Sequence, residues 1–128
     1  MPAWEEYKQA AKERGSLALE MFVVESTPAK TPEDVKENLP AHLAYQQTLE
    51  NAGTLAFAGP LSDDTGELMQ GTGLIVYRAS SMEEAKQIAE ADPMHQAGAR
   101  TYTLRKWLIN EGSFSLNVGL SAKRLTFI

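Results

Sequence analysis

His42 is the residue of this chain best suited to acid–base chemistry. It lies in the stretch LPAHLAYQQTLENAG, where positions 39, 42, 43, 46 and 49 fall on one side of a helix. Histidine changes its protonation state near neutral pH, so an inward-facing histidine can serve as a general acid or base. The alternative is a core histidine whose ring is satisfied by a backbone carbonyl group.

Asp92 is the second residue of interest, because it stands before Pro93 at the end of another expected helix. The residue before a proline disfavours helix, and a carboxylate at a helix C-terminus gains nothing from the helix dipole. Asp92 is therefore either a simple turn-former or the partner that orients the His42 imidazole and fixes its tautomer. If the two helices lie side by side, the two residues form a His–Asp dyad.

His95 follows Asp92 by three positions. We interpret it as an exposed loop histidine or, alternatively, as a second acid/base or a donor to a phenolate. A metal site built from His42, Asp92 and His95 is less favoured, because no His-x-His or Glu-x-x-His spacing accompanies these residues. Since Gly71-Thr72-Gly73 opens a strand and not a helix, it does not predict a phosphate loop. We predict neither a metal nor a cofactor.

Aromatic, sulfur-containing and glycine residues are expected to form a pocket for a small ring beside the dyad. Gly59-Pro60 marks a turn where the backbone approaches a ligand or a partner helix closely. Each aromatic side chain, including Tyr102 and Trp107, can instead belong to the core or to a dimer interface. The predicted substrate-binding residues are His95, Tyr45, Phe57, Gly59, Pro60, Met69 and Tyr77.

Composition excludes several classes of partner. The 128 residues suit a single domain, and the net charge of −5 comes without any cluster of Lys and Arg, which argues against nucleic acid. No apolar run approaches the length of a membrane span, and the charged start MPAWEEYKQ is unlike a secretory signal. The absence of cysteine excludes thiol catalysis and fits a reducing compartment. We therefore expect a cytoplasmic protein that acts on a small-molecule substrate.

Hydrophobic periodicity and capping signals predict the elements that must position these residues. Thr31 with Pro32 and Asp34 predicts a helix start, Pro40 predicts a break, and Ser81 with Glu84 predicts a capping box. The predicted order is a helix over 3–14, a strand over 17–24, helical segments from 31 to 51, a strand over 54–61, a turn at 63–66, a strand over 71–79, a helix from 81 to 92, a strand over 100–110 and a tail over 111–128.

This order predicts an α+β fold of the ferredoxin-like βαββαβ type, with helices on one face of an antiparallel four-stranded sheet. Residues 1–128 form one expected domain, with its core at about 17–110, an extra N-terminal helix and a C-terminal tail. The other face of the sheet still carries apolar side chains, so we expect a homodimer formed by face-to-face packing. The apolar tail should lie on the body of the protein or on the partner subunit.

The ordered set of short motifs also resembles the YCII-related family over roughly residues 18–110. These motifs are His42-Leu43, Gly53, Ala58-Gly59-Pro60-Leu61, Gly71-Thr72-Gly73-Leu74, Glu84-Ala85 and Asp92-Pro93. The resemblance implies a dimeric α/β barrel with a His–Asp dyad, which maps onto His42 and Asp92. It also implies kinship in fold with muconolactone isomerase-like proteins. The extra helix, the tail and His95, where an apolar residue is more usual, are departures that suggest a specialised pocket.

One branch of that family dehydrochlorinates a chlorohydroxyhydroquinone. The functional hypothesis is therefore a cofactor-independent acid/base enzyme, best represented by loss of chloride from a chlorinated hydroxyhydroquinone to give a hydroxyquinone. The alternatives are an isomerase similar to muconolactone isomerase, a non-catalytic ligand-binding or accessory protein, and an oligomeric interaction module. A cavity beside His42 favours the enzyme, whereas a filled core around it favours an accessory role.

Overall fold

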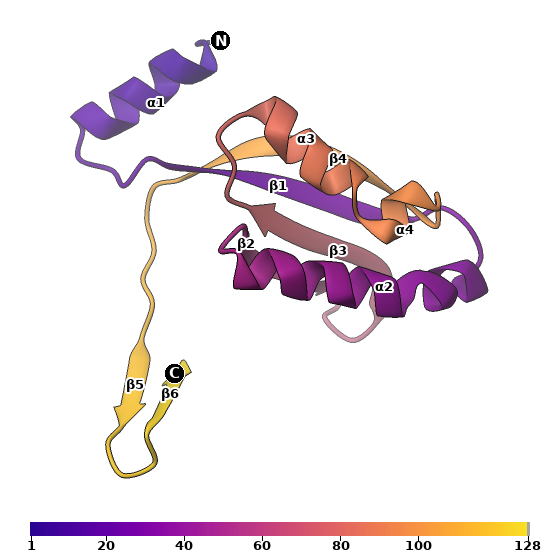
Figure 1. Cartoon of the computed structure of the whole chain (residues 1–128). Helices are drawn as coiled ribbons and strands as arrows, with labels where there is room; N and C mark the ends of the chain where they lie inside the picture. The colour runs from indigo at the N-terminus through magenta and orange to yellow at the C-terminus, as the bar shows by residue number, and fades with distance from the viewer. Residues whose placement is uncertain (128) are drawn as a thin grey trace. The chain divides into compact units, whose positions relative to one another are not determined.

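The computed structural model describes residues 1–127 of the chain (Figure 1). The chain divides into two compact units, one of residues 20–107 and one of Met1–Leu19 together with the chain from Leu108 onward. Both candidate catalytic residues belong to the first of these units. Among residues 1–127, no helix combines the length and the apolar character that crossing a membrane requires.

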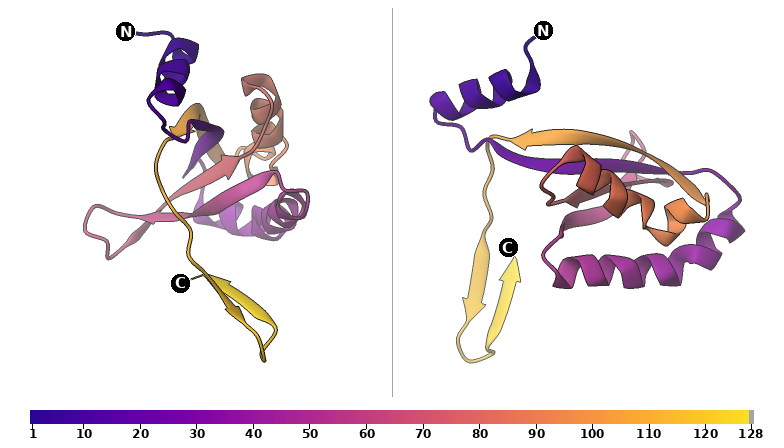
Figure 2. Two further views of the ribbon diagram at one scale, coloured as in Figure 1. Left: turned by 90° about the vertical axis from the view of Figure 1, so that its left-hand side faces the viewer. Right: turned by 45° about the horizontal axis from the view of Figure 1, so that its top comes forward.

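The larger unit is built around a four-stranded sheet with the strand order β2-β3-β1-β4. Strand β3 pairs antiparallel with both β1 and β2, and α2, α3 and α4 lie on one side of the sheet (Figure 2). This arrangement confirms the predicted ferredoxin-like α+β fold. The elements that form the sheet and its layer of helices are β1 (Leu19–Pro28), α2 (Pro32–Asn51), β2 (Leu55–Ser62), β3 (Met69–Tyr77), α3 (Met82–Glu90), α4 (Pro93–Gln96) and β4 (Arg100–Ile109).

Helix α2 begins where the sequence predicts and then continues where it predicts a break. The Thr31 hydroxyl accepts a hydrogen bond from the Asp34 backbone N–H at 3.2 Å, and the Asp34 carboxylate accepts one from the Thr31 N–H, also at 3.2 Å. The predicted break at Pro40 is wrong, because one helix runs through it. Pro40 removes one hydrogen bond to the Lys36 carbonyl. Both residues are exposed, so water can replace the missing donor.

Strand β1 is longer than predicted, because it runs on through a loop-like sequence to Pro28. Its pairing with β3 continues to Ser26 opposite Gly73, so the neighbouring strand overrides the local turn composition. The short helix α4 is also new, since residues 93–96 were expected to form a loop. At the start of α3, the Ser81 hydroxyl accepts from the Glu84 N–H at 3.1 Å. The Glu84 carboxylate, however, accepts from Ser80 and not from the Ser81 backbone.

The core of the larger unit lies between the sheet and the helices. Tyr77 is fully buried there, and within residues 1–127 its hydroxyl has no hydrogen-bond partner. This burial raises the pKa of the Tyr77 hydroxyl above its ordinary value. The cluster consists of Phe22, Val24, Ile75 and Tyr77 from the sheet, Leu49 from α2, and Ala85 and Ala89 from α3.

The smaller unit contains the predicted N-terminal helix and the tail. Helix α1 spans Trp4–Glu13, and the tail folds into a hairpin of β5 (Leu116–Gly119) and β6 (Arg124–Phe127). The Leu17 N–H donates to the Asn110 carbonyl at 3.0 Å, which joins the two parts of the unit. The hairpin was not predicted, and contact of the tail with the body or a partner stays a prediction. Residue 128, the last of the predicted tail, lies outside the described residues.

Candidate functional site

The structure brings His42 and Asp92 together across the 50 positions that separate them. The His42 Nδ1 atom lies 2.8 Å from Oδ2 and 2.9 Å from Oδ1 of Asp92. Asp92 is 1% exposed, whereas the His42 side chain is 15% exposed. Helix α2 thus presents a partly open imidazole, and a buried carboxylate stands behind it.

The expectation that Asp92 occupies an unfavourable helix C-terminus is wrong. Helix α3 ends at Glu90 with Ala91 as its C-cap, and Asp92 is the N-cap of α4. Its Oδ1 atom accepts a hydrogen bond from the Met94 backbone N–H at 2.9 Å. A carboxylate is a favoured N-cap, so α4 fixes the position of the group that faces His42.

These contacts determine the tautomer of the neutral His42 ring. An ionised carboxylate only accepts hydrogen bonds, so the His42 proton lies on Nδ1 and the lone pair on Nε2. The Gln46 side-chain nitrogen is 3.1 Å from Nε2, where it can donate to that lone pair. His42 therefore offers a basic nitrogen that a ligand can reach when the Gln46 amide moves aside.

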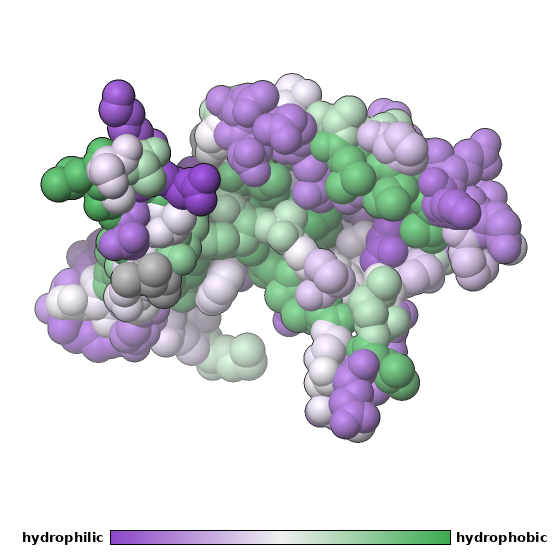
Figure 3. Space-filling model, turned by 90° about the horizontal axis from the view of Figure 1, so that it is seen from below, coloured by the Kyte–Doolittle hydropathy of each residue, from purple (hydrophilic) through white to green (hydrophobic). Residues whose placement is uncertain are grey.

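A groove of about 690 Å³ lies in front of His42, between α2 and the strands β2 and β3. Figure 3 views the molecule from below and shows apolar surface beside hydrophilic surface in the region of α2 and the projecting β2–β3 hairpin. A volume of this size suits a small ligand. Its lining includes four of the residues that the sequence predicts for catalysis or substrate binding, namely His42, Gly59, Pro60 and Met69.

The other predicted binding residues do not line the groove. The Tyr45 hydroxyl donates to the Ile88 carbonyl at 2.7 Å, and Tyr77 belongs to the core. Burial, followed by the charge of Asp92, raises the pKa of Tyr45. Phe57 pairs with Val76, on the side of the sheet opposite to Tyr77. Roles of these residues in binding stay predictions that the groove does not support directly.

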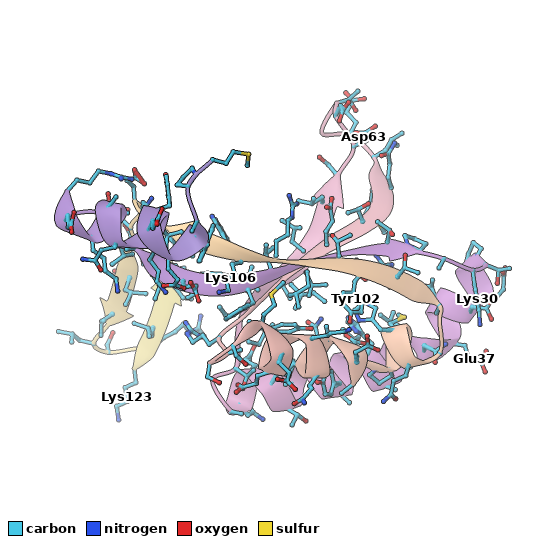
Figure 4. All side chains as sticks on the ribbon, turned by 90° about the horizontal axis from the view of Figure 1, so that it is seen from above. Lys30, Glu37, Asp63, Tyr102, Lys106 and Lys123 are labelled. Carbon is cyan, nitrogen blue, oxygen red and sulfur yellow. The ribbon has the colours of Figure 1, made fainter. Side chains whose placement is uncertain are left out.

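His95 is part of α4 and is held on both ring nitrogens. Its Nδ1 donates to the Ala89 carbonyl at 2.8 Å, so its Nε2 accepts from the Ser26 hydroxyl at 2.9 Å. The ring also lies 4.6 Å from that of Tyr102, centroid to centroid (Tyr102 is labelled in Figure 4). Burial raises the pKa of Tyr102 to about 12, with a smaller contribution from its hydrogen bond to Glu90. These bonds place His95 behind Ser26 and outside the groove lining.

Sequence reasoning missed Ser26 and Arg100, which both line the groove. Arg100 Nε donates to the Ser26 hydroxyl at 2.9 Å, and Nη2 donates to the Ser26 carbonyl at 2.7 Å and to the Gly71 carbonyl. Burial lowers the pKa of Arg100, and the charge of Asp92 opposes this effect. Strand alternation could have located both residues, because Ser26 follows Phe22 and Val24 on the inward face and Arg100 precedes Tyr102.

Gly71 supports this arrangement through its backbone. Its φ is +99°, and a Cβ atom added there would lie 2.8 Å from Pro28 Cγ. We expect Gly71→Ala to lower the free energy of unfolding by about 1–3 kcal/mol, because the side chain is both strained and crowded. Urea unfolding checks this. Gly66→Ala is the matched control, since Gly66 has a φ of +80° but no atom within 4 Å of the added Cβ. Equal losses in the two variants would show that Pro28 contributes nothing.

Residues 1–127 contain no group of three or more His, Asp or Glu side chains that could together hold a metal ion. The chemistry that the site offers with its own side chains is proton transfer at His42 Nε2, with Asp92 stabilising the imidazolium.

The chain is similar to proteins of one family. The sequence model of the YCII-related domain matches residues 18–108. The uncharacterized protein YjpA of Bacillus subtilis (strain 168) is 32% identical over 76 residues, which are 59% of this chain and 82% of that protein.

A solved structure shares the fold with a TM-score of 0.53. It is the 5-chloro-2-hydroxyhydroquinone dehydrochlorinase TftG of Burkholderia phenoliruptrix AC1100, in complex with 2,5-dihydroxybenzoquinone. The match has 22% sequence identity and covers 68% of this chain and 92% of that one. At this identity the likeness establishes the fold.

Proposed function

The chain belongs to the YCII-related family, and from this premise we propose that it is a cytoplasmic, cofactor-independent acid–base enzyme. Its substrate is a small aromatic or oxygenated molecule. The reaction that fits best is dehydrochlorination of a chlorinated hydroxyhydroquinone to a hydroxyquinone, which makes the protein a lyase. One observation carries the proposal: the His42 ring lines a groove while its Nδ1 is held 2.8 Å from a buried carboxylate.

The proposed reaction needs only proton transfers and loss of chloride. Two ring hydroxyls give up their protons and become carbonyls, and one proton returns to the ring carbon that carries chlorine. The electron pair of the C–Cl bond leaves with chloride, so the net loss is HCl and no outside oxidant is required. His42 Nε2 takes a hydroxyl proton and returns it to the ring, while Asp92 stabilises the intermediate imidazolium.

The groove walls fit a flat, apolar ring. Aliphatic and sulfur-containing side chains from α2, α4 and the sheet form much of the lining, namely Leu39, Leu43, Met69, Leu74, Ile75 and Met94. Met side chains adapt to ring edges, and an apolar site with few polar groups is typical of a small-ligand pocket.

The direct test is chloride release from 5-chloro-2-hydroxyhydroquinone, measured with an ion-selective electrode under nitrogen. We expect chloride and a visible-absorbing quinone to form in equal amounts, at a rate proportional to protein concentration and above the protein-free blank. Chloride release no faster than the blank would reject the proposed reaction.

A second candidate is a protein that binds such a ring without converting it. The observation that favours it is the Gln46 amide, which occupies His42 Nε2 at 3.1 Å. If binding does not displace this amide, the base is never available. Calorimetry with 2,5-dihydroxybenzoquinone distinguishes the two functions, since tight binding without any chloride release from the chlorinated ring supports the binding protein.

We further propose that the protein is a homodimer that pairs through the sheet face opposite to α2, α3 and α4. Phe57 lies on that face and is 48% exposed. Trp107, which alternates with the inward residues of β4, is 46% exposed. Arg105 and Glu25 add opposite charges at 3.8 Å from each other. In a two-fold dimer, Arg105 of one copy can pair with Glu25 of the second copy, and Glu25 of the first with Arg105 of the second.

We expect Trp107→Glu to raise the dimer dissociation constant by about 30-fold or more, because it places a charge in an apolar interface. Sedimentation equilibrium measures this shift. Met82→Glu is the control, since Met82 is 40% exposed at the start of α3, on the helical side. A monomeric wild-type protein, or equal dissociation of the two variants, would contradict the proposed interface.

A further inference from the structure

The charged residues that line the groove are all cationic. The chain as a whole has a net charge of −5, yet the described lining includes Lys30, Arg100 and the titratable His42 and contains no Asp or Glu. The Asp92 carboxylate lies behind His42 and is satisfied by the His42 ring and the Met94 N–H. A ligand in this groove therefore meets positive charge.

Arg100 is held in place by its other bonds, which leaves one nitrogen for a ligand. Nε and Nη2 donate to Ser26 and to the Gly71 carbonyl, whereas Nη1 has no hydrogen-bond partner within residues 1–127. A guanidinium that is fixed by two of its nitrogens loses little freedom when the third binds an oxygen. Lys30, by comparison, is exposed and donates to the Ala97 carbonyl at 2.9 Å (Lys30 is labelled in Figure 4).

The Ser26 hydroxyl cannot take the place of Arg100 as a donor. Ser26 is 3% exposed, and its hydroxyl accepts from Arg100 Nε while it donates its one proton to His95 Nε2. The His95 Nδ1 proton is in turn used by the Ala89 carbonyl. This chain of bonds is complete, so among Ser26, His95 and Arg100 the charged donor left for a ligand is Arg100 Nη1.

We propose that the groove binds its ring-shaped ligand as an anion, with a phenolate or carboxylate oxygen on Arg100 Nη1. Arg100 is then a specificity-determining residue that selects anionic rings over neutral rings. The inference rests on the proposed function in placing a ring beside His42. It adds the charge of the substrate and the residue that recognises this charge.

Two probes that differ by one carboxylate test the proposal, namely 2,5-dihydroxybenzoate and its neutral counterpart hydroquinone. Calorimetry at low ionic strength should show that the wild-type protein binds the anion about 10- to 100-fold more tightly. Raising the ionic strength from about 0.01 M to about 1 M should weaken binding of the anion and leave hydroquinone nearly unchanged. Equal affinities of the wild-type protein for the two probes, or no binding of the anion, would overturn the proposal before any variant is made.

Arg100→Gln should bring the ratio of the two affinities close to one, and Arg100→Lys should keep part of the preference. Lys30→Gln is the comparison that separates general positive charge from the fixed guanidinium. A preference that survives Arg100→Gln but disappears in Lys30→Gln would overturn the assignment to Arg100. If Arg100→Gln does not fold, the proposal is still tested by the affinity ratio of the wild-type protein and by whether Lys30→Gln keeps the preference for the anion.

The readout is binding alone, so its outcome is separate from turnover. A protein that prefers the anion but releases no chloride keeps this inference and loses the proposed reaction. A protein that releases chloride but binds the two probes equally keeps the reaction and loses this inference.

Discussion

Replacement of His42 by alanine is expected to lower kcat for chloride release by about 10²- to 10⁴-fold, the usual contribution of a positioned acid–base group. The ring lines the groove and supplies Nε2, which accepts a proton while Nδ1 stays bonded to Asp92. His42→Ala leaves the buried Asp92 carboxylate bonded to the Met94 N–H, so we expect a lower free energy of unfolding but a folded protein. Steady-state kinetics measure the loss, and circular dichroism verifies the fold.

The matched control for this variant is Gln47→Ala. Gln47 is exposed on the same helix, and within residues 1–127 its side chain bonds only to Glu50 and Asn51 of α2. It should retain the kcat of the wild-type protein. If His42→Ala also releases chloride at the wild-type rate, His42 has no part in the reaction.

Asp92→Asn is expected to lower kcat by a similar factor, about 10²- to 10⁴-fold, with little loss of stability. The asparagine carbonyl can still accept from the Met94 N–H, so α4 keeps its cap. The asparagine NH₂ group, however, donates to His42 Nδ1 and forces the ring proton onto Nε2. The base then faces the groove already protonated, and no carboxylate balances the imidazolium.

Asp92→Ala separates the two roles of this residue. It removes both the orienting group and the cap, so it should lose turnover and also about 1–2 kcal/mol of unfolding free energy. Urea unfolding of the two variants provides the comparison. Wild-type kcat in Asp92→Asn would show that the carboxylate serves the helix alone.

The fold could be predicted because its signals are local and repeated. Alternation in the strands placed Phe22 and Val24 on one face, and Thr31 with Asp34 marked the start of α2 as the structure has it. Helix periodicity placed His42 inward, and the proline after Asp92 ended α3 nearby. The antiparallel βαββαβ order then left one face of the sheet on which the two helices could meet.

What could not be predicted depends on contacts between distant segments. Pro40 breaks an isolated helix, but in the folded chain it costs one exposed hydrogen bond and α2 continues. Ser26 and Arg100 lie 74 positions apart, and only strand pairing and the close approach of Gly71 bring their groups together. Tyr45 and Tyr77 were assigned to the pocket by their chemical type, yet packing places both against the core. Residue type indicates which side chains could line a ligand pocket, whereas packing in the folded chain determines which of them do.

The Asp92 carboxylate that faces His42 also caps the N-terminus of α4. This double role affects how related sequences should be interpreted. In a descendant that has given up the reaction, loss of the histidine removes one partner of the buried carboxylate but leaves α4 capped, whereas loss of the aspartate removes the cap itself. Homologues that lack the activity should therefore keep the aspartate after the histidine has been replaced. In a survey of related sequences, an aspartate without the histidine indicates only a conserved helix start, and the two residues together indicate an enzyme.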